Sequence, residues 1–472
     1  MIQRILFALI CAAPLLATAA KPNIILVMAD DLGWGDVGFN GNRVIRTPHL
    51  NAMAKNSLRF ERFYAAAPVC SPTRGSCITG RHPFRYGIYF ANTGHMKTEE
   101  LTLAELLKKH GYTTGHFGKW HLGTLTKTEK EANRGGPRGV KNFSPPQVNG
   151  FDVCFSTESK VPTWDPMLRP KTSKSKTWWD PAKDNGPYGT AYWNEKGARV
   201  TENLRGDDSR VIMDRAIPFI RAAVKQEQPF FTIVWFHAPH LPVVAGPEYT
   251  KLYAKHSKFA QHYYGCITAL DEQLGRLRKE LRTLGIADNT LLAFCSDNGP
   301  EGQSGKNPGS AGHLNGRKRS LLEGGIRVPG LIEWPAKIKP GKTDILAVTS
   351  DYLPTILEII GAEQTDKRPL DGISLLSLFE GKMKERDQPI GFQSAGQVAL
   401  IGDRYKIYGS GGRKKEQELT LPKLKLFDLK KDPSEKNDLA SQHPDLIKKM
   451  TATLEQWRKS CRHSDTGGDY ED

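Results

Sequence analysis

The sequence predicts an α/β protein with a mostly parallel central sheet flanked by helices, followed by a smaller C-terminal antiparallel sheet with one helix. Two observations predict the first part: nearly continuous apolar runs that end in polar residues, and helical stretches between these runs. A third observation predicts the second part, because after about residue 382 the apolar runs become short and alternate with polar residues. We therefore expect a large domain at residues 21–382 and a smaller subdomain at residues 383–472.

Composition is that of an ordinary soluble globular protein, with 38% hydrophobic and 25% charged residues in a chain of 472. The formal net charge of +16 favours anionic partners such as sulfated glycans, nucleic acid or a membrane surface. A general contribution to solubility is the alternative explanation. The basic stretches contain no nucleic-acid-binding module, so we expect no nucleic-acid partner.

Residues 1–20 have the features of a secretory signal peptide. Arg4 precedes an apolar run at 5–16, and small residues at 17–20 place the expected cleavage near Ala20. The apolar run is too short to span a membrane comfortably, and no other long apolar segment follows. We expect an exported protein, periplasmic or secreted, with no integral membrane segment after cleavage.

The apolar runs of the large domain are each followed by side chains that can take part in chemistry. They cover 23–29, 229–236 and 290–295, and 112–117 is a weaker strand of the same layout. The polar residues that follow these strands are Asp30, Asp31, Lys119, His121, His237, His240, Asp297 and Asn298. In open α/β sheets, ligands bind where the carboxyl ends of the strands meet. We therefore expect these side chains to lie together at one edge of the sheet.

Helices are predicted between the strands and loops elsewhere. Apolar residues recur at helical spacing in 102–110, 208–224 and 259–284, and Pro218 is expected to kink or divide the second of these stretches. Segments 127–149 and 160–206 lack periodicity and are predicted to be long surface loops. Their aromatic residues either stack on sugar rings or anchor the loops to the body of the protein.

The C-terminal region has a different pattern. Residues 397–407 predict two short strands, 423–429 a half-exposed strand and 443–462 an amphipathic helix. The acidic tail at 465–472 is expected to be mobile.

Cys70 lies in the pattern Cys-x-Pro-x-Arg with Pro72 and Arg74. Proline is well tolerated in a first helical turn, so Cys70 is expected at a helix N-terminus, where the dipole favours an anion. Arg74, one turn later, adds a fixed positive charge. This pattern indicates either an activated cysteine beside an anion-binding site or a buried structural cysteine before a turn. The other cysteines show no metal-binding or redox spacing and are expected to be small buried residues.

Oxygen ligands for a metal ion are also present. Asp30, Asp31, Asp297 and Asn298 form a hard oxygen set that suits Ca²⁺ or Mg²⁺ better than Zn²⁺. Adjacent carboxylates repel each other unless a cation or another partner lies between them. Asp36 is expected to stabilise its own loop instead.

Together these motifs resemble the formylglycine-dependent sulfatases, the arylsulfatase-like members of the alkaline phosphatase superfamily. The matching segments follow the order of that family and span most of the chain: 30–33, 70–74, 118–123, 237–240, 296–299, Lys318 and 323–325. The resemblance implies an alkaline phosphatase-like fold.

The resemblance also implies cofactors and roles. A formylglycine-generating enzyme would convert Cys70 to Cα-formylglycine, whose gem-diol attacks sulfur. Ca²⁺, bound by the oxygen set above, would contact residue 70. Lys119 and His121 would bind formylglycine or sulfate, Arg74 would orient the formylglycine, and His240 and Lys318 would contact sulfate and the departing oxygen. We prefer His240 to His237 because the family's catalytic residue is followed by x-Pro, as in His240-Leu241-Pro242; His237 then orients a neighbour.

The resulting hypothesis is an exported sulfatase that hydrolyses sulfate esters of a sulfated carbohydrate. A formylglycine-dependent phosphonate or phosphate-ester hydrolase is a close alternative, because the tetrahedral anions are similar. A non-catalytic protein that binds sulfated glycans is the alternative from another class.

Overall fold

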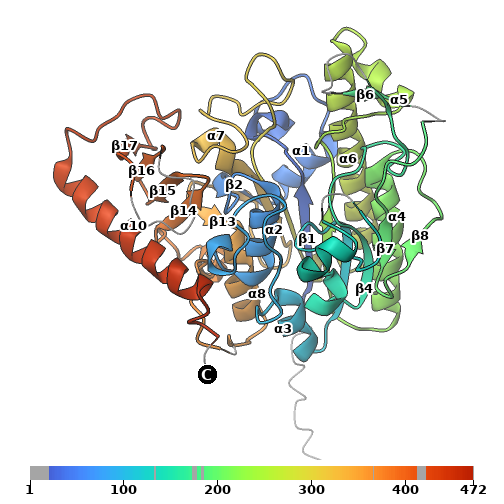
Figure 1. Cartoon of the computed structure of the whole chain (residues 1–472), viewed down its shortest axis with the longest axis horizontal. Helices are drawn as coiled ribbons and strands as arrows, with labels where there is room; N and C mark the ends of the chain where they lie inside the picture. The colour runs from blue at the N-terminus through green and yellow to red at the C-terminus, as the bar shows by residue number, and fades with distance from the viewer. Residues whose placement is uncertain are drawn as a thin grey trace, which may run out of the picture.

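The computed structural model describes residues 21–131, 134–172, 178–181, 185–364, 366–411 and 421–470. The expected signal peptide lies outside these residues. The described chain forms an 11-stranded central sheet, a separate four-stranded sheet and a small two-stranded ribbon (Figure 1). No helix within the described ranges is long and apolar enough to cross a membrane.

The middle of the central sheet is a block of parallel strands. Their order across the sheet is β10 (Thr290–Ser296), β1 (Asn23–Ala29), β9 (Phe230–Trp235), β3 (Thr113–Lys119) and β4 (Val153–Thr157). Four of these strands are the apolar runs predicted from the sequence, which confirms the mostly parallel α/β sheet. The parallel arrangement brings the carboxyl ends of these strands to one edge of the sheet.

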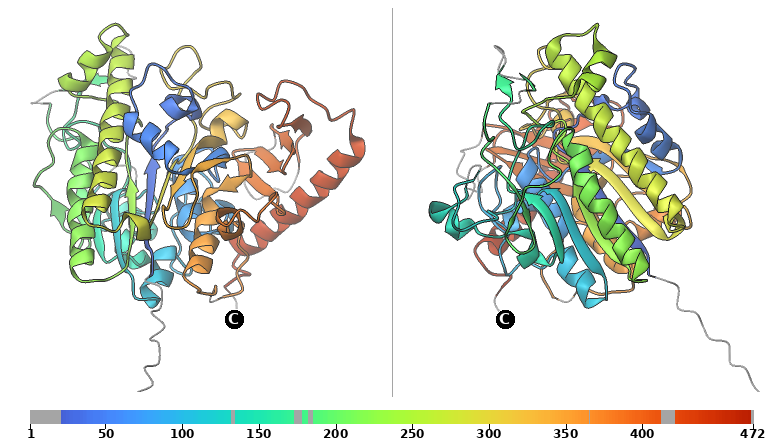
Figure 2. Two further views of the ribbon diagram at one scale, coloured as in Figure 1. Left: turned by 180° about the vertical axis from the view of Figure 1, so that it is seen from behind. Right: turned by 90° about the vertical axis from the view of Figure 1, so that its right-hand side faces the viewer.

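Helices cover both faces of this block, which explains why β1, β9 and β10 are apolar along nearly their whole length. Ile24, Leu26 and Met28 of β1 belong to one core cluster, whereas Ile25 and Val27 belong to another. The first cluster lies against α2 (Cys70–Thr79), α3 (Leu103–Lys109) and α8 (Tyr352–Ile359); the second lies against α1 (Pro48–Lys55), α4 (Asp208–Lys225) and α6 (Lys258–Thr283). Figure 2 shows α4 and α6 side by side on their face of the sheet.

Further strands extend the parallel block on both sides, and they were not predicted from the sequence. On one side lie β11 (Arg327–Glu333), β2 (Leu58–Tyr64), β12 (Gly341–Thr343) and β13 (Ala347–Val348); on the other lie β7 (Tyr192–Asn194) and β8 (Arg199–Val200). The sheet is mixed here, because β11 is antiparallel to β10 and β2, and β7 is antiparallel to β4 and β8, whereas β12 and β13 pair with β2 in parallel. The ribbon pairs β5 (Lys171–Thr172) with β6 (Trp179–Asp180), and short helices are α5 (Pro247–Thr250), α7 (Glu323–Ile326) and α9 (Leu376–Phe379). Of the two segments expected to be loops, 160–206 therefore contains short strands.

Helix α4 runs without a break through Pro218, so the expected division into two helices is wrong. Val211 and Ile212 are buried before the proline, and Phe219 and Ile220 are buried after it. Because both halves pack against the core, their burial outweighs the single backbone hydrogen bond that proline removes.

The C-terminal part forms its own antiparallel sheet with one long helix, as predicted. Its strands are β14 (Ile390–Ser394), β15 (Gln397–Ile401), β16 (Tyr405–Gly409) and β17 (Lys425–Asp428), and its helix is α10 (Pro444–Asp465). Figure 1 shows this part beside the large domain, in orange and red. The exact division at residue 382 stays a prediction.

The end of the chain is held by contacts through Tyr470, so the expectation of a mobile tail is wrong for its described part. Asp469 Oδ2 lies 2.5 Å from Arg81 Nη2, and the Tyr470 hydroxyl donates to Glu100. Both partners belong to the segment that follows α2, so the tail covers that segment.

Asp371 joins the C-terminal helix to the same segment. Its carboxylate accepts hydrogen bonds from Arg85 Nε at 2.6 Å, Arg85 Nη2 at 2.9 Å and Trp457 Nε1 at 2.8 Å. Burial alone would raise the pKa of Asp371, but the Arg85 charge and these hydrogen bonds lower it to about 2. The ionised carboxylate is therefore strongly stabilised by the fold.

We expect Asp371→Asn to lower the free energy of unfolding by about 3–5 kcal/mol, because it leaves the buried Arg85 without its anion. The pKa of Asp371 is depressed in the folded protein, so its contribution is complete above about pH 4 and is lost as the pH falls towards 2. Denaturant unfolding of both proteins across this pH range measures the difference. Glu380→Gln, which removes an exposed ion pair with Lys382, is the control and should change stability by less than about 1 kcal/mol. Equal effects of the two substitutions would contradict the assignment.

Candidate active site

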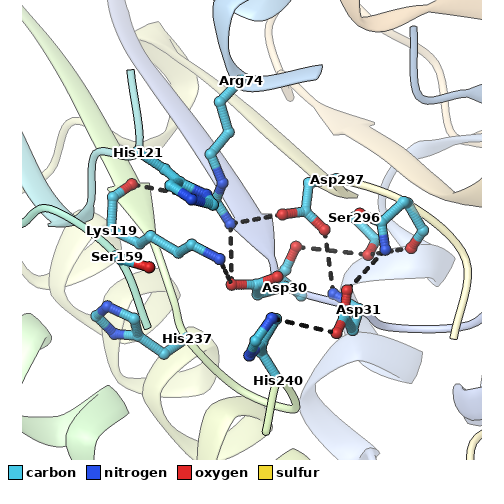
Figure 3. Close-up of polar contacts among 12 residues, drawn as sticks. Asp30, Asp31, Arg74, Lys119, His121, Ser159, His237, His240, Ser296 and Asp297 are labelled. Atoms are coloured by element: carbon cyan, nitrogen blue, oxygen red, sulfur yellow. Dashed lines mark hydrogen bonds and ion pairs between the residues drawn. The ribbon is translucent and has the colours of Figure 1, made fainter. Parts of the chain in front are cut away.

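The polar residues that follow the parallel strands meet at one edge of the sheet (Figure 3). Ligand atoms of Asp30, Asp31, Cys70 and His240 all lie within 4.8 Å of one another. Asp30 and Asp31 follow β1, His240 follows β9, and Cys70 is the first residue of α2. Asp30, Asp31 and His240, which the strand pattern placed at this edge, therefore lie together, and Cys70 lies beside them; their roles stay predictions.

Helix α2 presents Cys70 at its N-terminus and buries Arg74 behind it. Both side chains are inaccessible, with Cys70 at 2% and Arg74 at 0% exposure. Arg74 Nη2 lies 2.7 Å from Asp297 Oδ2 and 3.4 Å from Asp30 Oδ2, and Nη1 donates to the Lys119 carbonyl at 3.1 Å. These contacts fix the guanidinium as a permanent positive charge that joins the ends of three strands.

Lys119 ends β3 and reaches Asp30. Its Nζ lies 2.5 Å from Asp30 Oδ2, and both side chains are fully buried. Gly118 allows the end of β3 to pack closely against β9, because a Cβ there would lie 1.9 Å from the Trp235 carbonyl oxygen and its φ is +108°. Burial alone would raise the pKa of Asp30, but the charges of Lys119 and Arg74 hold it well below its ordinary value. Asp30 is therefore ionised.

Asp31 is held by Lys318 and Asn298. Lys318 Nζ lies 2.7 Å from Asp31 Oδ1, and Asn298 Nδ2 donates to the same oxygen at 2.7 Å. The Asp31 backbone has a left-handed φ of +66°, and its N–H donates to Asp297 Oδ1 at 3.1 Å. Burial disfavours the Lys318 ammonium, but the Asp31 carboxylate keeps its pKa well above the ordinary value. Lys318 therefore remains a cation.

The oxygen atoms fit a hard divalent cation. Asp30 Oδ1 and Asn298 Oδ1 are buried and accept no hydrogen bond from any described residue. Burial and the nearby Asp30 charge raise the pKa of Asp297 to about 7, which shows that the carboxylates repel one another here. A Ca²⁺ ion would relieve that repulsion and use the free oxygens. Both oxygens of Asp297 are already engaged within the protein, Oδ1 by the Asp31 N–H and Oδ2 by Arg74.

His121 lies near the cluster without contacting its carboxylates. It adopts a left-handed φ of +61°, is 3% exposed, and its Nε2 pairs with Asn92 Oδ1 at 2.7 Å. Burial, followed by the Lys119 charge, lowers the pKa of His121 well below its ordinary value. The imidazole is therefore neutral.

The two histidines after β9 have different surroundings. His237 is fully buried, with Nδ1 2.8 Å from Asp208 Oδ2 and Nε2 2.8 Å from Thr157 Oγ1, so both ring nitrogens are engaged within the protein. His240 Nδ1 donates to the Leu241 carbonyl at 2.5 Å, and its Nε2 lies 3.7 Å from Asp31 Oδ2. Figure 3 shows His240, and not His237, directed at the cluster. This geometry favours His240 for a role at the reacting group.

Several residues near the site were missed by the sequence analysis. Asp208 positions His237, while Ser159 and Lys160 follow β4, a strand that the analysis did not predict. Burial and the charges of Lys119 and Lys318 lower the pKa of the Lys160 ammonium, which places it near the cluster. Recognition of β4 as a parallel strand would have pointed to its carboxyl end.

Other expectations concern residues outside the cluster. Asp36 accepts hydrogen bonds from Gly33 N, Ser310 N and the Tyr263 hydroxyl, which confirms its role in stabilising its loop. Tyr192 and Trp193 are buried, so these two aromatic residues anchor their segment to the body of the protein. All six described cysteines are free and buried.

The unmodified Cys70 thiol is not activated. Burial raises the pKa of Cys70 to about 11, even though Lys119 and Lys318 act in the opposite direction. The thiol is therefore neutral at physiological pH, and its position at the helix N-terminus does not make it a nucleophile.

Comparison with known proteins identifies the family. The sulfatase family profile matches residues 22–362. The chain belongs to the sulfatase family. A second profile, N-sulphoglucosamine sulphohydrolase, C-terminal, matches residues 312–460. The sulfatase is a sulfuric ester hydrolase, and its architecture is alkaline phosphatase-like.

Individual relatives are similar to this sulfatase over nearly its whole length. Human arylsulfatase A is 31% identical over 91% of this chain and 86% of its own length. N-acetylgalactosamine-6-sulfatase from Rattus norvegicus is 28% identical over 97% of this chain and 90% of its own. The crystal structure of Ps i-CgsB in complex with k-i-k-neocarrahexaose has a TM-score of 0.77 and 28% identity, covering 94% of each chain.

Proposed function

We propose that the protein is an exported sulfatase that hydrolyses sulfate esters of a sulfated carbohydrate, using a formylglycine made from Cys70 and a bound Ca²⁺. The observation that carries this proposal is the cluster of Cys70, Asp30, Asp31 and His240 within 4.8 Å, with buried cations around it. The sugar is supported by the relatives, one named for N-acetylgalactosamine 6-sulfate hydrolysis and one holding a neocarrahexaose.

The residues that would hold Ca²⁺ are Asp30, Asp31, Asp297 and Asn298, with residue 70 beside them. Formylglycine at position 70 would supply a hydrated aldehyde as the nucleophile. Ca²⁺ supplies positive charge that favours the ionised nucleophile and the sulfate oxygens.

The chain's own cations prepare the site for a sulfate group. Arg74, Lys119 and Lys318 are buried and each contacts a carboxylate of the cluster. Their ammonium and guanidinium groups are held in place before substrate arrives, so they stabilise negative charge on the sulfate oxygens without reorganising. His121, neutral and positioned by Asn92, is available as a hydrogen-bond partner at the rim of this site.

His240 is proposed to deliver the proton to the departing alkoxide from Nε2. Its Nδ1 proton is hydrogen-bonded to the Leu241 carbonyl, so Nε2 is the nitrogen that gains and loses a proton. Burial lowers the pKa of His240 to about 4, which leaves it neutral without substrate. An incoming sulfate anion raises that pKa and favours the protonated form when it is needed.

Parallel assays test the proposed reaction. The matured protein is expected to hydrolyse sulfate monoesters much faster than phosphate monoesters or phosphonate monoesters of the same alcohol. A preference for phosphonates would favour the alternative hydrolase. Tight binding of a sulfated oligosaccharide by fully matured protein, with no release of sulfate, would favour the non-catalytic alternative.

Substitution of His240 should have an effect that depends on the leaving group. A sugar alkoxide is a strong base and needs protonation, whereas a nitrophenolate leaves easily. We expect His240→Ala to reduce kcat/KM for sugar sulfates by about 10²–10⁴-fold and to reduce turnover of nitrophenyl sulfate far less.

His237→Ala is the comparison, because His237 has both nitrogens engaged within the protein. Any loss it causes should be similar for sugar and aryl sulfates. If His240→Ala also reduced both substrates equally, His240 would not be the acid, and Lys318 would become the next candidate.

Export and maturation complete the proposal. Residues 1–20 would direct the chain to the periplasm or the exterior, and a formylglycine-generating enzyme would act on it during maturation. The N-terminal sequence of the recovered protein should begin near residue 21, and an intact N-terminus on the active protein would contradict export through cleavage.

A further inference from the structure

A cavity lies apart from the carboxylate cluster, in the part of the chain that follows β3. Its volume is about 570 Å³, and its lining residues are Lys130, Glu131, Arg134, Gly135, Pro137, Arg138, Gly139 and Asn142. We call it the basic cavity. Its volume lies within the range of about 300–1,000 Å³ that is typical of small-molecule sites, so it is large enough for part of an oligosaccharide.

The basic cavity carries uncompensated positive charge. Among the described residues, the side chains of Lys130 and Arg138 are exposed and have no ion-pair or hydrogen-bond partner. Glu131, the one carboxylate among the described residues of the wall, accepts hydrogen bonds from Thr190 Oγ1 at 2.6 Å, Ala191 N at 2.7 Å and Trp193 Nε1 at 2.7 Å. Because these donors occupy both of its oxygens, Glu131 is buried against its own neighbours and forms no ion pair with Lys130 or Arg138.

Arg134 connects the basic cavity to the candidate active site. It lines the cavity, and its Nη2 donates to the His121 carbonyl at 3.5 Å while its Nε lies 3.3 Å from Glu158 Oε1. His121 belongs to the loop after β3, and Glu158 directly follows β4. One wall of the cavity is therefore formed by a residue that contacts two strand ends of the catalytic edge.

We propose that the basic cavity binds a second anionic group of the substrate, a sulfate ester or a carboxylate, on a sugar next to the one whose sulfate is removed. This inference rests on the proposed function. Free Lys and Arg side chains donate charge-assisted hydrogen bonds to either anion. The position beside the His121 loop suits a neighbouring sugar, and the unpaired charge gives the sulfatase a preference for polyanionic glycans.

The test compares three disaccharides that share the same cleavable sulfate. The neighbouring sugar carries a second sulfate in the first, a carboxylate in the second and neither in the third. Wild-type protein is expected to show higher kcat/KM for at least one of the first two. The double variant Lys130→Gln/Arg138→Gln should reduce that preference about tenfold, as expected for the loss of charge-assisted contacts. The relative sizes of the first two effects identify the anion.

The matched control is Lys109→Gln/Lys141→Gln, which removes the same charge at exposed positions outside the cavity. It should leave the preference within about twofold. An equal loss in both double variants would show a general effect of net charge and overturn the proposal. An unchanged preference in the Lys130→Gln/Arg138→Gln variant would overturn it as well.

Two further measurements separate this inference from the proposed function. If wild-type protein hydrolyses nitrophenyl sulfate but shows no preference among the three disaccharides, the cavity proposal is overturned and the proposed function is not. Calorimetry on Cys70→Ala protein measures binding of the three disaccharides without turnover. The same measurement is made on Cys70→Ala protein that also carries Lys130→Gln/Arg138→Gln. If this protein binds the dianionic disaccharides more weakly than Cys70→Ala protein does, the basic cavity is supported even if the reaction class were different.

Discussion

Cys70→Ala should abolish sulfate-ester hydrolysis while the protein remains folded. Cys70 is the one residue of the cluster that can become the proposed nucleophile. The surrounding Asp, Lys and His side chains are proposed to bind the metal, stabilise negative charge or transfer a proton. Loss of a nucleophile typically costs on the order of 10⁶-fold in kcat. The change removes only one buried sulfur atom, so the free energy of unfolding should fall by about 1 kcal/mol. Turnover and thermal unfolding of the same preparation measure the two effects.

Cys77→Ala provides the matched control, because Cys77 is a buried cysteine in the same helix and has no place in the cluster. It should retain activity. Peptide mass spectrometry of wild-type protein should show the mass loss that accompanies conversion of the thiol at position 70 to an aldehyde. A fully active protein with an intact thiol at position 70 would refute the maturation proposal.

Removal of the metal should have the second-largest effect. Chelation is expected to abolish activity, and added Ca²⁺ should restore it, because the cluster's carboxylates otherwise repel one another. Asp31→Asn should weaken Ca²⁺ binding and reduce kcat by about 10²–10³-fold, the typical cost of removing one contributor to transition-state charge stabilisation. Asparagine tolerates the left-handed backbone of position 31, so the loop should keep its conformation.

Asp36→Asn is the control for this substitution. Asp36 is a buried aspartate of the same loop region, but its hydrogen bonds go to Gly33, Ser310 and Tyr263. Calorimetric titration of chelator-treated protein with Ca²⁺ should give one strong site in Asp36→Asn protein and a much weaker one in Asp31→Asn protein. Unaltered Ca²⁺ affinity in Asp31→Asn protein would remove Asp31 from the ligand set.

The parallel core and its edge could be predicted from the sequence because their causes are local. A strand buried on both faces must be apolar along its length, as residues 23–29 are, and the residue after it lies at the ligand-binding edge. The pattern of apolar runs was therefore enough to place Asp30, His240 and Asp297 together. Cys70 begins a helix and does not follow a strand, so the strand pattern could not place it at this edge. Only the family motifs indicated that it belongs to the site.

Other features depend on distant contacts that no local pattern shows. Strand β2 contains Arg59 and Glu61 among its apolar residues, and β11 contains Pro329, so neither has a clear strand pattern. Pairing with other strands decides their conformation. The engagement of His237 by Asp208, the high pKa of the Cys70 thiol and the ordered tail likewise arise from residues brought together only by folding.

The complete burial of α2 has a consequence for the order of events during biosynthesis. All ten residues of Cys70–Thr79 are buried in the folded protein, so a modifying enzyme cannot bind Cys70, Pro72 and Arg74 there. The proposed conversion of Cys70 would then have to take place before folding ends. Helix α10 is synthesised after α2, and its Trp457 donates to Asp371, which also binds Arg85 of the segment after α2. Until α10 has been made, that contact is missing, so the residues of the proposed modification signal would be easier to reach on the growing chain.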